Sequence, residues 1–246
     1  MLPIRDHNPS ERTPYVTYAL IAINIVVFAW QYGVLTEVSV NNQFLIDYAF
    51  WPILLENGEG TTGLFTHMFL HGGFMHIAGN MLFLWIFGDN MEDELGPMPF
   101  LIFYVLSGLA AAYLQYLFNP NSRIPMVGAS GAIAGVMGGY LLLFPKARVD
   151  IFFFFIIFFR IFSLPSFIVL GAWMALQVFN GLGSDLNGGG TAYWAHVGGF
   201  IAGLVMTIPL WLRRGAARYW DRTDGHPPHP ETNYPTSNVP LIRRQR

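Results

Sequence analysis

Four polar side chains interrupt stretches of sequence that are otherwise apolar: His76, Asn80, Ser130 and His196. Such side chains are costly inside a membrane, so they usually face the interior of a helix bundle or take part in function. A serine hydroxyl and a neutral imidazole can react together, because the imidazole accepts the hydroxyl proton while the oxygen attacks an amide carbonyl. Ser130 and His196 are therefore a candidate catalytic pair for nucleophilic chemistry.

The oxyanion formed in such an attack needs hydrogen-bond donors. His76 and Asn80 are four residues apart, so on a helix they share one face, one turn apart. The backbone N–H of Ser130 would lie at a helix start, where the helix dipole adds partial positive charge. These three residues are the candidate oxyanion donors. The apolar stretch around His196 has no Asp or Glu to orient the ring, so the predicted centre is a dyad.

Each of these residues also has a simpler interpretation. A serine in a Gly- and Ala-rich helix usually serves packing. His196 could be a satisfied interior residue, and Asn80 could bond to a neighbouring helix. A transporter or proton relay through His76, Asn80 and His196 is a further alternative, although such relays usually contain intramembrane carboxylates.

Two more histidines, His67 and His71, are four residues apart, a spacing that can bind metal. No Glu stands between them and the chain has no cysteine. The alternative, that they structure a loop by hydrogen bonding, is favoured on these grounds. We therefore expect no metal and no cofactor.

The composition is that of a polytopic membrane protein, with 53% hydrophobic and 11% charged residues in a chain of 246. Apolar runs predict six spans, at roughly 15–32, 74–91, 98–118, 130–145, 165–179 and 193–212. Residues 34–73 contain no piece long enough to span and are predicted to lie in the membrane interface. Residues 151–159 are rich in Phe and Ile but are followed at once by Arg160, which favours an interfacial strip or loop over a span.

Charge fixes the predicted orientation. Lys and Arg cluster before the first span, after the fourth and after the sixth, whereas the opposite side has only Arg123. The positive-inside rule therefore places both termini in the cytoplasm and Ser130 on the outer side, in a plasma (inner) membrane. The predicted fold is an all-α six-helix membrane domain at 15–213, between a cytoplasmic segment 1–14 and a cytoplasmic, disordered tail 214–246.

The fourth predicted span is short. Residues 130–145 make about 22 Å of helix, less than the hydrocarbon core of about 30 Å. With Lys146 at the cytoplasmic interface, Ser130 lies several ångströms below the outer surface. A loop must dip to meet it, and such backbone is tolerated only inside protein or beside a water-filled cavity. The sequence therefore predicts a hydroxyl in a sunken, hydrated hollow.

Small residues predict which spans meet. Glycines recur every four residues at 131, 135 and 139 in the fourth span, and Ala195, Gly199 and Gly203 recur at the same interval in the sixth. This pattern lets helix backbones approach closely in lipid. We therefore expect these two spans to touch, so that Ser130 can reach His196.

At these residues the chain resembles the rhomboid intramembrane serine proteases. The matching stretches are Gly128-Ala-Ser-Gly131, Ala195-His196-Val-Gly-Gly199 and His76-Ile-Ala-Gly-Asn80, the last preceded by Phe65-Thr66-His67-Met68-Phe69-Leu70-His71-Gly72. The resemblance covers roughly residues 12–213. Together the motifs are highly specific.

The resemblance implies a six-helix rhomboid-like bundle, a Ser130–His196 dyad and an oxyanion site of His76, Asn80 and the Ser130 backbone. It implies a serine endopeptidase that cleaves single-span transmembrane proteins in or near their membrane helix, with the lipid bilayer as its surroundings and no nucleic acid as partner. It also implies that the fifth span and the 180–191 loop gate substrate access. The alternative within the family is a non-catalytic protein that binds transmembrane helices, although a binder needs neither the serine nor the histidine.

Two positions depart from the family pattern. Several members have an aromatic residue four positions after the serine, where it stacks on the histidine, and this chain has Ala134. The outer loop lacks the Trp-Arg pair common before the Phe-Thr motif and has Gly63-Leu64 instead. Neither departure removes a reacting group.

Overall fold

The computed structural model describes residues 2–34, 38–155, 158–184 and 190–234. Its elements in chain order are β1 (Leu2–Asp6), α1 (Tyr15–Val34), α2 (Val38–Tyr48), α3 (Pro52–Glu56), α4 (Gly63–Thr66), η1 (His67–Phe69), α5 (Phe74–Leu95), α6 (Pro97–Phe118), α7 (Ser130–Leu143), β2 (Arg148–Phe155), β3 (Phe158–Pro165), α8 (Ser166–Gly183), α9 (Tyr193–Arg213) and α10 (Ala217–Thr223).

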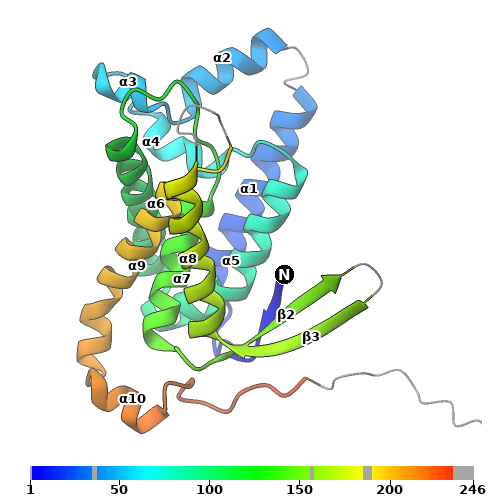
Figure 1. The fold of residues 1–246 in the computed structure, drawn as a ribbon, viewed down its shortest axis with the longest axis vertical. Helices are drawn as coiled ribbons and strands as arrows, with labels where there is room; N and C mark the ends of the chain where they lie inside the picture. The colour runs from blue at the N-terminus through cyan, green and yellow to red at the C-terminus, as the bar shows by residue number, and fades with distance from the viewer. Residues whose placement is uncertain (1, 35–37, 156–157, 185–189, 235–246) are drawn as a thin grey trace, which may run out of the picture.

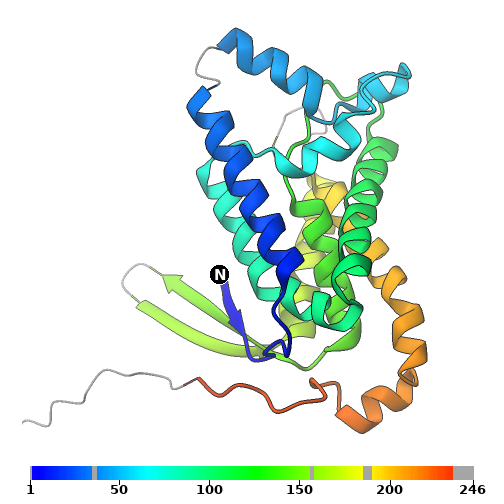
Figure 2. The same cartoon turned by 180° about the vertical axis from the view of Figure 1, so that it is seen from behind.

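The long helices α1, α5, α6, α7, α8 and α9 run between two ends of the molecule (Figures 1 and 2). We call the end with α2, α3 and α4 the loop end, and the end with β1, the sheet and α10 the sheet end (Figure 1). Among the described residues, α1, α6, α8 and α9 are each long and apolar enough to cross a membrane, and α5 qualifies together with the Gly63–Phe69 segment, from which it is bent by 90°. The described ranges thus contain four to five candidate membrane spans.

Helix α7 is the shorter apolar helix at the centre of this group. It is buried along most of its length and packs against α5, α6, α8 and α9. Its 14 residues correspond to about 21 Å. The predicted short fourth helix is therefore present, and Pro145 follows its last residues as expected.

A three-stranded antiparallel sheet in the order β1-β2-β3 lies at the sheet end. Leu2 pairs with Phe152 and Asp6 with Val149, while β2 and β3 form a hairpin in which Arg148 pairs with Pro165. The all-α prediction is therefore wrong, and the predicted strip or loop at 151–159 is largely strand. Dense Phe and Ile favour strands, and the first residues of the chain supply the third strand.

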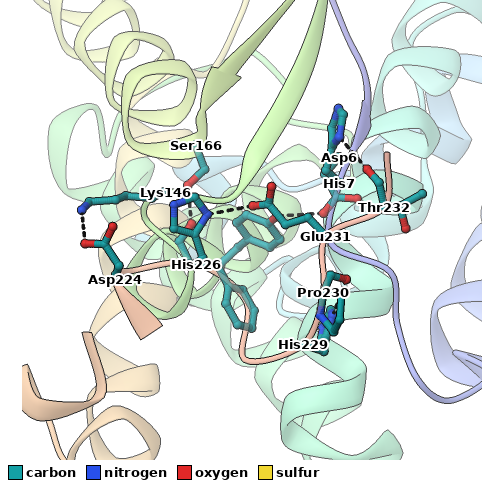
Figure 3. A network of polar contacts seen from close by, with 12 residues as sticks. Asp6, His7, Lys146, Ser166, Asp224, His226, His229, Pro230, Glu231 and Thr232 are labelled. Atoms are coloured by element: carbon teal, nitrogen blue, oxygen red, sulfur yellow. Dashed lines mark hydrogen bonds and ion pairs between the residues drawn. The ribbon is translucent and has the colours of Figure 1, made fainter. Parts of the chain in front are cut away.

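The prediction of a disordered tail is wrong for residues 217–234. Helix α10 and the extended segment after it cross the sheet end, where the Trp220 indole N–H donates to the Leu142 carbonyl at 3.0 Å. Figure 3 shows the contacts further along: Lys146 pairs with Asp224, and His226 bonds to Glu231. The part of the tail at 235–246 lies outside the described residues.

Candidate active site

Ser130 is the first residue of α7, and the loop before it is held in place by backbone contacts. Met126 exchanges two backbone hydrogen bonds with Phe50, at 3.1 and 2.8 Å, and the Gly128 N–H donates to the His67 carbonyl at 2.8 Å. Gly128 has φ +124°, a conformation that favours glycine, and a Cβ there would lie 2.7 Å from His76 Nε2. The loop therefore reaches α7 by passing directly over the His76 ring.

Helices α7 and α9 touch through their glycines, as predicted. A Cβ on Gly199 would collide with the Gly131 carbonyl, and one on Gly203 would collide with the Gly135 carbonyl. Because the two backbones are this close, a short side chain on α7 can reach the imidazole on α9. His196 Nε2 lies 2.8 Å from Ser130 Oγ, within hydrogen-bond distance.

Both side chains are partly exposed, on the wall of a cavity of about 620 Å³ that His76, Asn80 and Gly128 also line. The cavity lies at the loop-end terminus of α7, between the 122–128 loop and the start of α9. Ser130 is thus not sealed in dry packing. The geometry fits a nucleophile and base that both water and a peptide can reach.

His76 and Asn80 lie one turn apart on α5 and face the Gly128 backbone. The Gly72 N–H donates to His76 Nδ1 at 3.4 Å, which leaves the proton of the neutral ring on Nε2, the nitrogen nearest Gly128. The Asn80 amide nitrogen is buried and has no hydrogen-bond partner within the described part of the chain. Two N–H donors are therefore available beside Ser130.

The start of α7 supplies further donors. Its first intrahelical bond runs from the Ile133 N–H to the Ala129 carbonyl at 3.0 Å. In an α-helix, the N–H groups that precede this bond have no intrahelical acceptor. The Ser130 N–H is one of them and lies at the positive end of the helix dipole.

His67 and His71, the pair with metal-ligand spacing, lie outside the group of donors beside Ser130. His67 is buried, and its Nδ1 lies 2.8 Å from the Gly63 carbonyl, to which it donates. His71 is buried with its ring centroid 5.1 Å from that of His76. Over the described ranges, no group of three or more His, Cys, Asp or Glu side chains is placed to hold a metal ion.

A residue that sequence reasoning missed touches His196 on its other side. Gln177, on α8, has its Oε1 2.8 Å from His196 Nδ1. The Trp173 ring, one turn earlier on α8, lies 5.6 Å from the imidazole at 34°. Like Asn80, Gln177 is an amide in a predicted apolar span, and this is the sequence signal that could have found it.

The two departures from the family pattern have packing explanations. Ala134 is fully buried, and its Cβ would lie 3.4 Å from a Cβ on Gly199, so a bulky side chain at 134 would enter the α7–α9 contact. Trp173 provides an aromatic ring beside the imidazole instead. Gly63 packs so closely on the Ala49 backbone that any Cβ there would collide with it.

A family model described as the rhomboid domain matches residues 58–213. The chain belongs to the rhomboid family. It is 32% identical to Rhomboid protein 1, mitochondrial, of Saccharomyces cerevisiae over 199 residues. These residues make up 77% of this chain and 51% of the relative. It is 29% identical over 208 residues to Rhomboid protease GluP of Bacillus subtilis, covering 83% of this chain and 36% of that protein.

Rhomboid protease GlpG of Salmonella paratyphi A is 25% identical to this rhomboid over 199 residues, which are 80% of this chain and 64% of the relative. The chain thus spans between about a third and two thirds of the length of these three relatives. Two of the three carry the word protease in their names. The resemblance found in the short motifs is therefore confirmed at the level of the family.

Proposed function

We propose that this rhomboid is an intramembrane serine endopeptidase in which Ser130 is the nucleophile and His196 its base. One observation carries the proposal: the 2.8 Å approach of Ser130 Oγ to His196 Nε2, at the wall of a cavity within a group of apolar helices. The membership of the family and the names of its relatives support the same activity.

The reaction follows from the geometry. His196 Nε2 accepts the Ser130 hydroxyl proton while Oγ bonds to the carbonyl carbon of the scissile peptide. When the tetrahedral intermediate collapses, the peptide C–N bond breaks and His196 Nε2–H protonates the leaving amine. Water then attacks the acyl-enzyme, giving its proton to the same nitrogen, and Ser130 regains its proton as the acid product leaves.

The oxyanion would be held by His76 Nε2–H, Asn80 Nδ2–H and the Ser130 N–H, all of which lie around the cavity. Donors that are already in place cost no reorganisation as the charge develops. The Asn80 amide nitrogen fits this role: buried donors normally have an acceptor, and in the described part of the chain this one has none, so it is available to the oxyanion.

The position of α7 supports a site of hydrolysis below the membrane surface. If its Pro145 end lies at one interface, its 14 residues leave Ser130 on the order of 9 Å below the other. We place the sheet end in the cytoplasm, because Lys and Arg gather there, and the cavity toward the outer side of a plasma (inner) membrane. With α7 as a further span, six helices form the membrane domain. Substrates are single-span transmembrane proteins that enter this hollow from the bilayer.

The test uses two substitutions and two assays on the full chain in detergent or vesicles. Ser130→Ala and His196→Ala should each abolish cleavage across a panel of reconstituted single-span proteins, and Ser130→Ala should also abolish labelling by a fluorophosphonate probe. Both variants should keep the thermal stability of the wild type. Undiminished cleavage by Ser130→Ala would end the proposal, because it would show that the reaction does not need the Ser130 hydroxyl as its nucleophile.

A further inference from the structure

We propose that Gln177 is a positioning residue that selects the reactive tautomer of His196, so that α8 completes the catalytic centre. This inference rests on the proposed function, because it assigns His196 the role of base. Gln177 is 8% exposed and lies on a helix that carries neither Ser130 nor His196.

The orientation of the Gln177 amide follows from its two partners. Its nitrogen lies 3.4 Å from the Trp173 carbonyl, which can only accept a hydrogen bond. The amide oxygen therefore faces the other way, toward His196 Nδ1 at 2.8 Å. Because that oxygen can only accept, Nδ1 must carry the proton of the neutral ring.

The tautomer decides whether His196 can act as a base. With the proton on Nδ1, Nε2 has a free lone pair and can accept the Ser130 hydroxyl proton across the 2.8 Å contact. With the proton on Nε2, the ring could only donate to Ser130. A chain of hydrogen bonds from the Trp173 carbonyl through Gln177 and His196 to Ser130 thus sets the direction of proton transfer.

Trp173 contacts the same imidazole. It lies four residues before Gln177, so both side chains project from one face of α8. Its ring centroid is 5.6 Å from that of His196 and 6.4 Å from that of Phe200. Two side chains of α8 therefore contact the imidazole, in a site that has no aromatic residue at position 134.

A neutral amide differs from the carboxylate of a triad in a measurable way. Gln177 orients the ring in both protonation states but adds no charge to stabilise the imidazolium. A carboxylate at the same place would keep the acceptor and favour the protonated ring. Exchange of the amide for an acid should therefore raise the pH at which the base becomes available.

The experiment compares the rate of fluorophosphonate labelling, as a function of pH, for the wild type, Gln177→Leu, Gln177→Glu and the control Leu176→Ala. Leu176 is the neighbouring residue on α8 but its side chain is exposed. We expect Gln177→Leu to lower the limiting labelling rate on the order of tenfold, with little change in the probe's apparent binding constant, because one hydrogen bond that sets a tautomer is lost. Gln177→Glu should keep most of the rate and move the acid limb of the profile to higher pH, and Leu176→Ala should match the wild type.

A second measurement reads the tautomer directly. In protein labelled with ¹⁵N-histidine, the His196 signals are those lost in His196→Ala, and the wild type should show them as the Nδ1–H form, in contrast to Gln177→Leu. A wild-type profile in both Gln177 variants, or an Nε2–H ring in the wild type, would overturn the inference. If Gln177→Leu does not fold, the Gln177→Glu profile and the wild-type spectrum decide.

Failure of the two proposals can be told apart. A wild type that neither labels nor cleaves, with Ser130→Ala indistinguishable from it, removes the proposed function. The ¹⁵N spectra would still show whether Gln177 governs the ring. Equal labelling of the wild type and Gln177→Leu at every pH removes the role of Gln177 and leaves the dyad intact.

Discussion

Asn80 is a single side chain whose role in catalysis can be separated from its role in packing. It is 9% exposed, it lines the cavity, and its amide N–H₂ is without a hydrogen-bond partner in the described ranges. A donor that is unused in the resting protein can stabilise a charge that exists only in the transition state.

We therefore expect Asn80→Ala to lower kcat by about 10²-fold to 10³-fold, the usual effect of removing one oxyanion donor, while KM changes little. Asn24 is the control, because it is also a buried amide, on α1, but its N–H₂ bonds to the Leu20 carbonyl and it does not line the cavity. Asn24→Ala should affect thermal stability more than kcat. Equal kcat losses in the two variants would show that Asn80 acts through the fold alone.

Single residues were predictable where their type contrasts with their surroundings. Ser130, His196, His76 and Asn80 stand out as polar groups in apolar stretches, and the structure brings all four to one cavity. Gln177 is also a polar group in an apolar stretch, but no spacing in the sequence relates positions 177 and 196, so its contact with His196 could not be predicted. Such a contact depends on the rotation of α8 about its axis, which hydropathy does not define.

The elements that position the dyad depend on the contact between α7 and α9. At Gly199 a Cβ would meet the backbone of α7 at the Gly131 carbonyl, which cannot move aside as a flexible side chain would. At Gly171, on α8, the same added group would meet no atom within 4 Å in the described ranges, apart from the adjacent backbone of its own helix. A Gly→Ala substitution can therefore be compared at a tight helix contact, Gly199, and at an open position, Gly171.

Gly199→Ala should lower the stability of the protein by about 1–3 kcal/mol or more, because the two helices must separate. It should also reduce fluorophosphonate labelling, since separation lengthens the Ser130–His196 contact. Gly171→Ala should be neutral or stabilise by up to about 1 kcal/mol through helix propensity. Thermal unfolding in detergent measures both, and equal midpoints would contradict the close approach.

The helices could be predicted from the sequence, and the sheet could not. Long apolar runs define spans, so the six predicted ranges overlap α1, α5, α6, α7, α8 and α9. The sheet requires β1 to pair with β2, which lies far along the chain: Pro3 pairs with Ile151, 148 positions later. A local pattern of Phe and Ile indicates apolar surface but does not reveal the partner strand.

At the scale of the whole molecule, the sheet end brings the N-terminal strand together with the C-terminal segment up to Tyr234. The Thr232 N–H donates to the His7 carbonyl at 3.0 Å, and His7 Nδ1 lies 2.7 Å from the Thr232 carbonyl (Figure 3). The Arg5 guanidinium lies 3.8 Å from the Tyr234 ring centroid. The N-terminal strand is thus held between the β2–β3 hairpin and the C-terminal segment.

Asp150, on β2, is the charged centre of this arrangement. Its carboxylate is 2.7 Å from Arg5 Nε and 2.9 Å from His7 Nε2, and it also accepts the Ser163 hydroxyl. Burial acts to raise the pKa of Asp150, but the hydrogen bonds from Ser163, His7 and Arg5 outweigh it and hold the pKa below its ordinary value. Asp6, at the end of β1, differs: burial and the nearby Asp89 raise its pKa well above the ordinary value.

These opposite shifts give opposite signs of pH dependence. Because the pKa of Asp150 is lowered on folding, its contribution to stability is present above its unfolded pKa of about 3.8 and is lost as the pH falls through the lower folded value. Because the pKa of Asp6 is raised, its protonated form favours the folded state, and stability falls as the pH rises from about 3.8 through the higher folded value.

We predict that Asp150→Asn weakens the attachment of β1 at neutral pH, because Arg5 and His7 lose their charged partner. Hydrogen exchange at the amides of residues 2–6 and 148–155 should become faster, by an amount that corresponds to about 1–3 kcal/mol of local opening free energy. As the pH falls from about 3.8 through the lower folded pKa, the difference from the wild type should shrink, because the Asp150 carboxylate is protonated first in the open state and then in the folded state, while the amide does not titrate. A gap between the two proteins that stays constant or widens as the pH falls would show that Asp150 does not hold β1 through its charge.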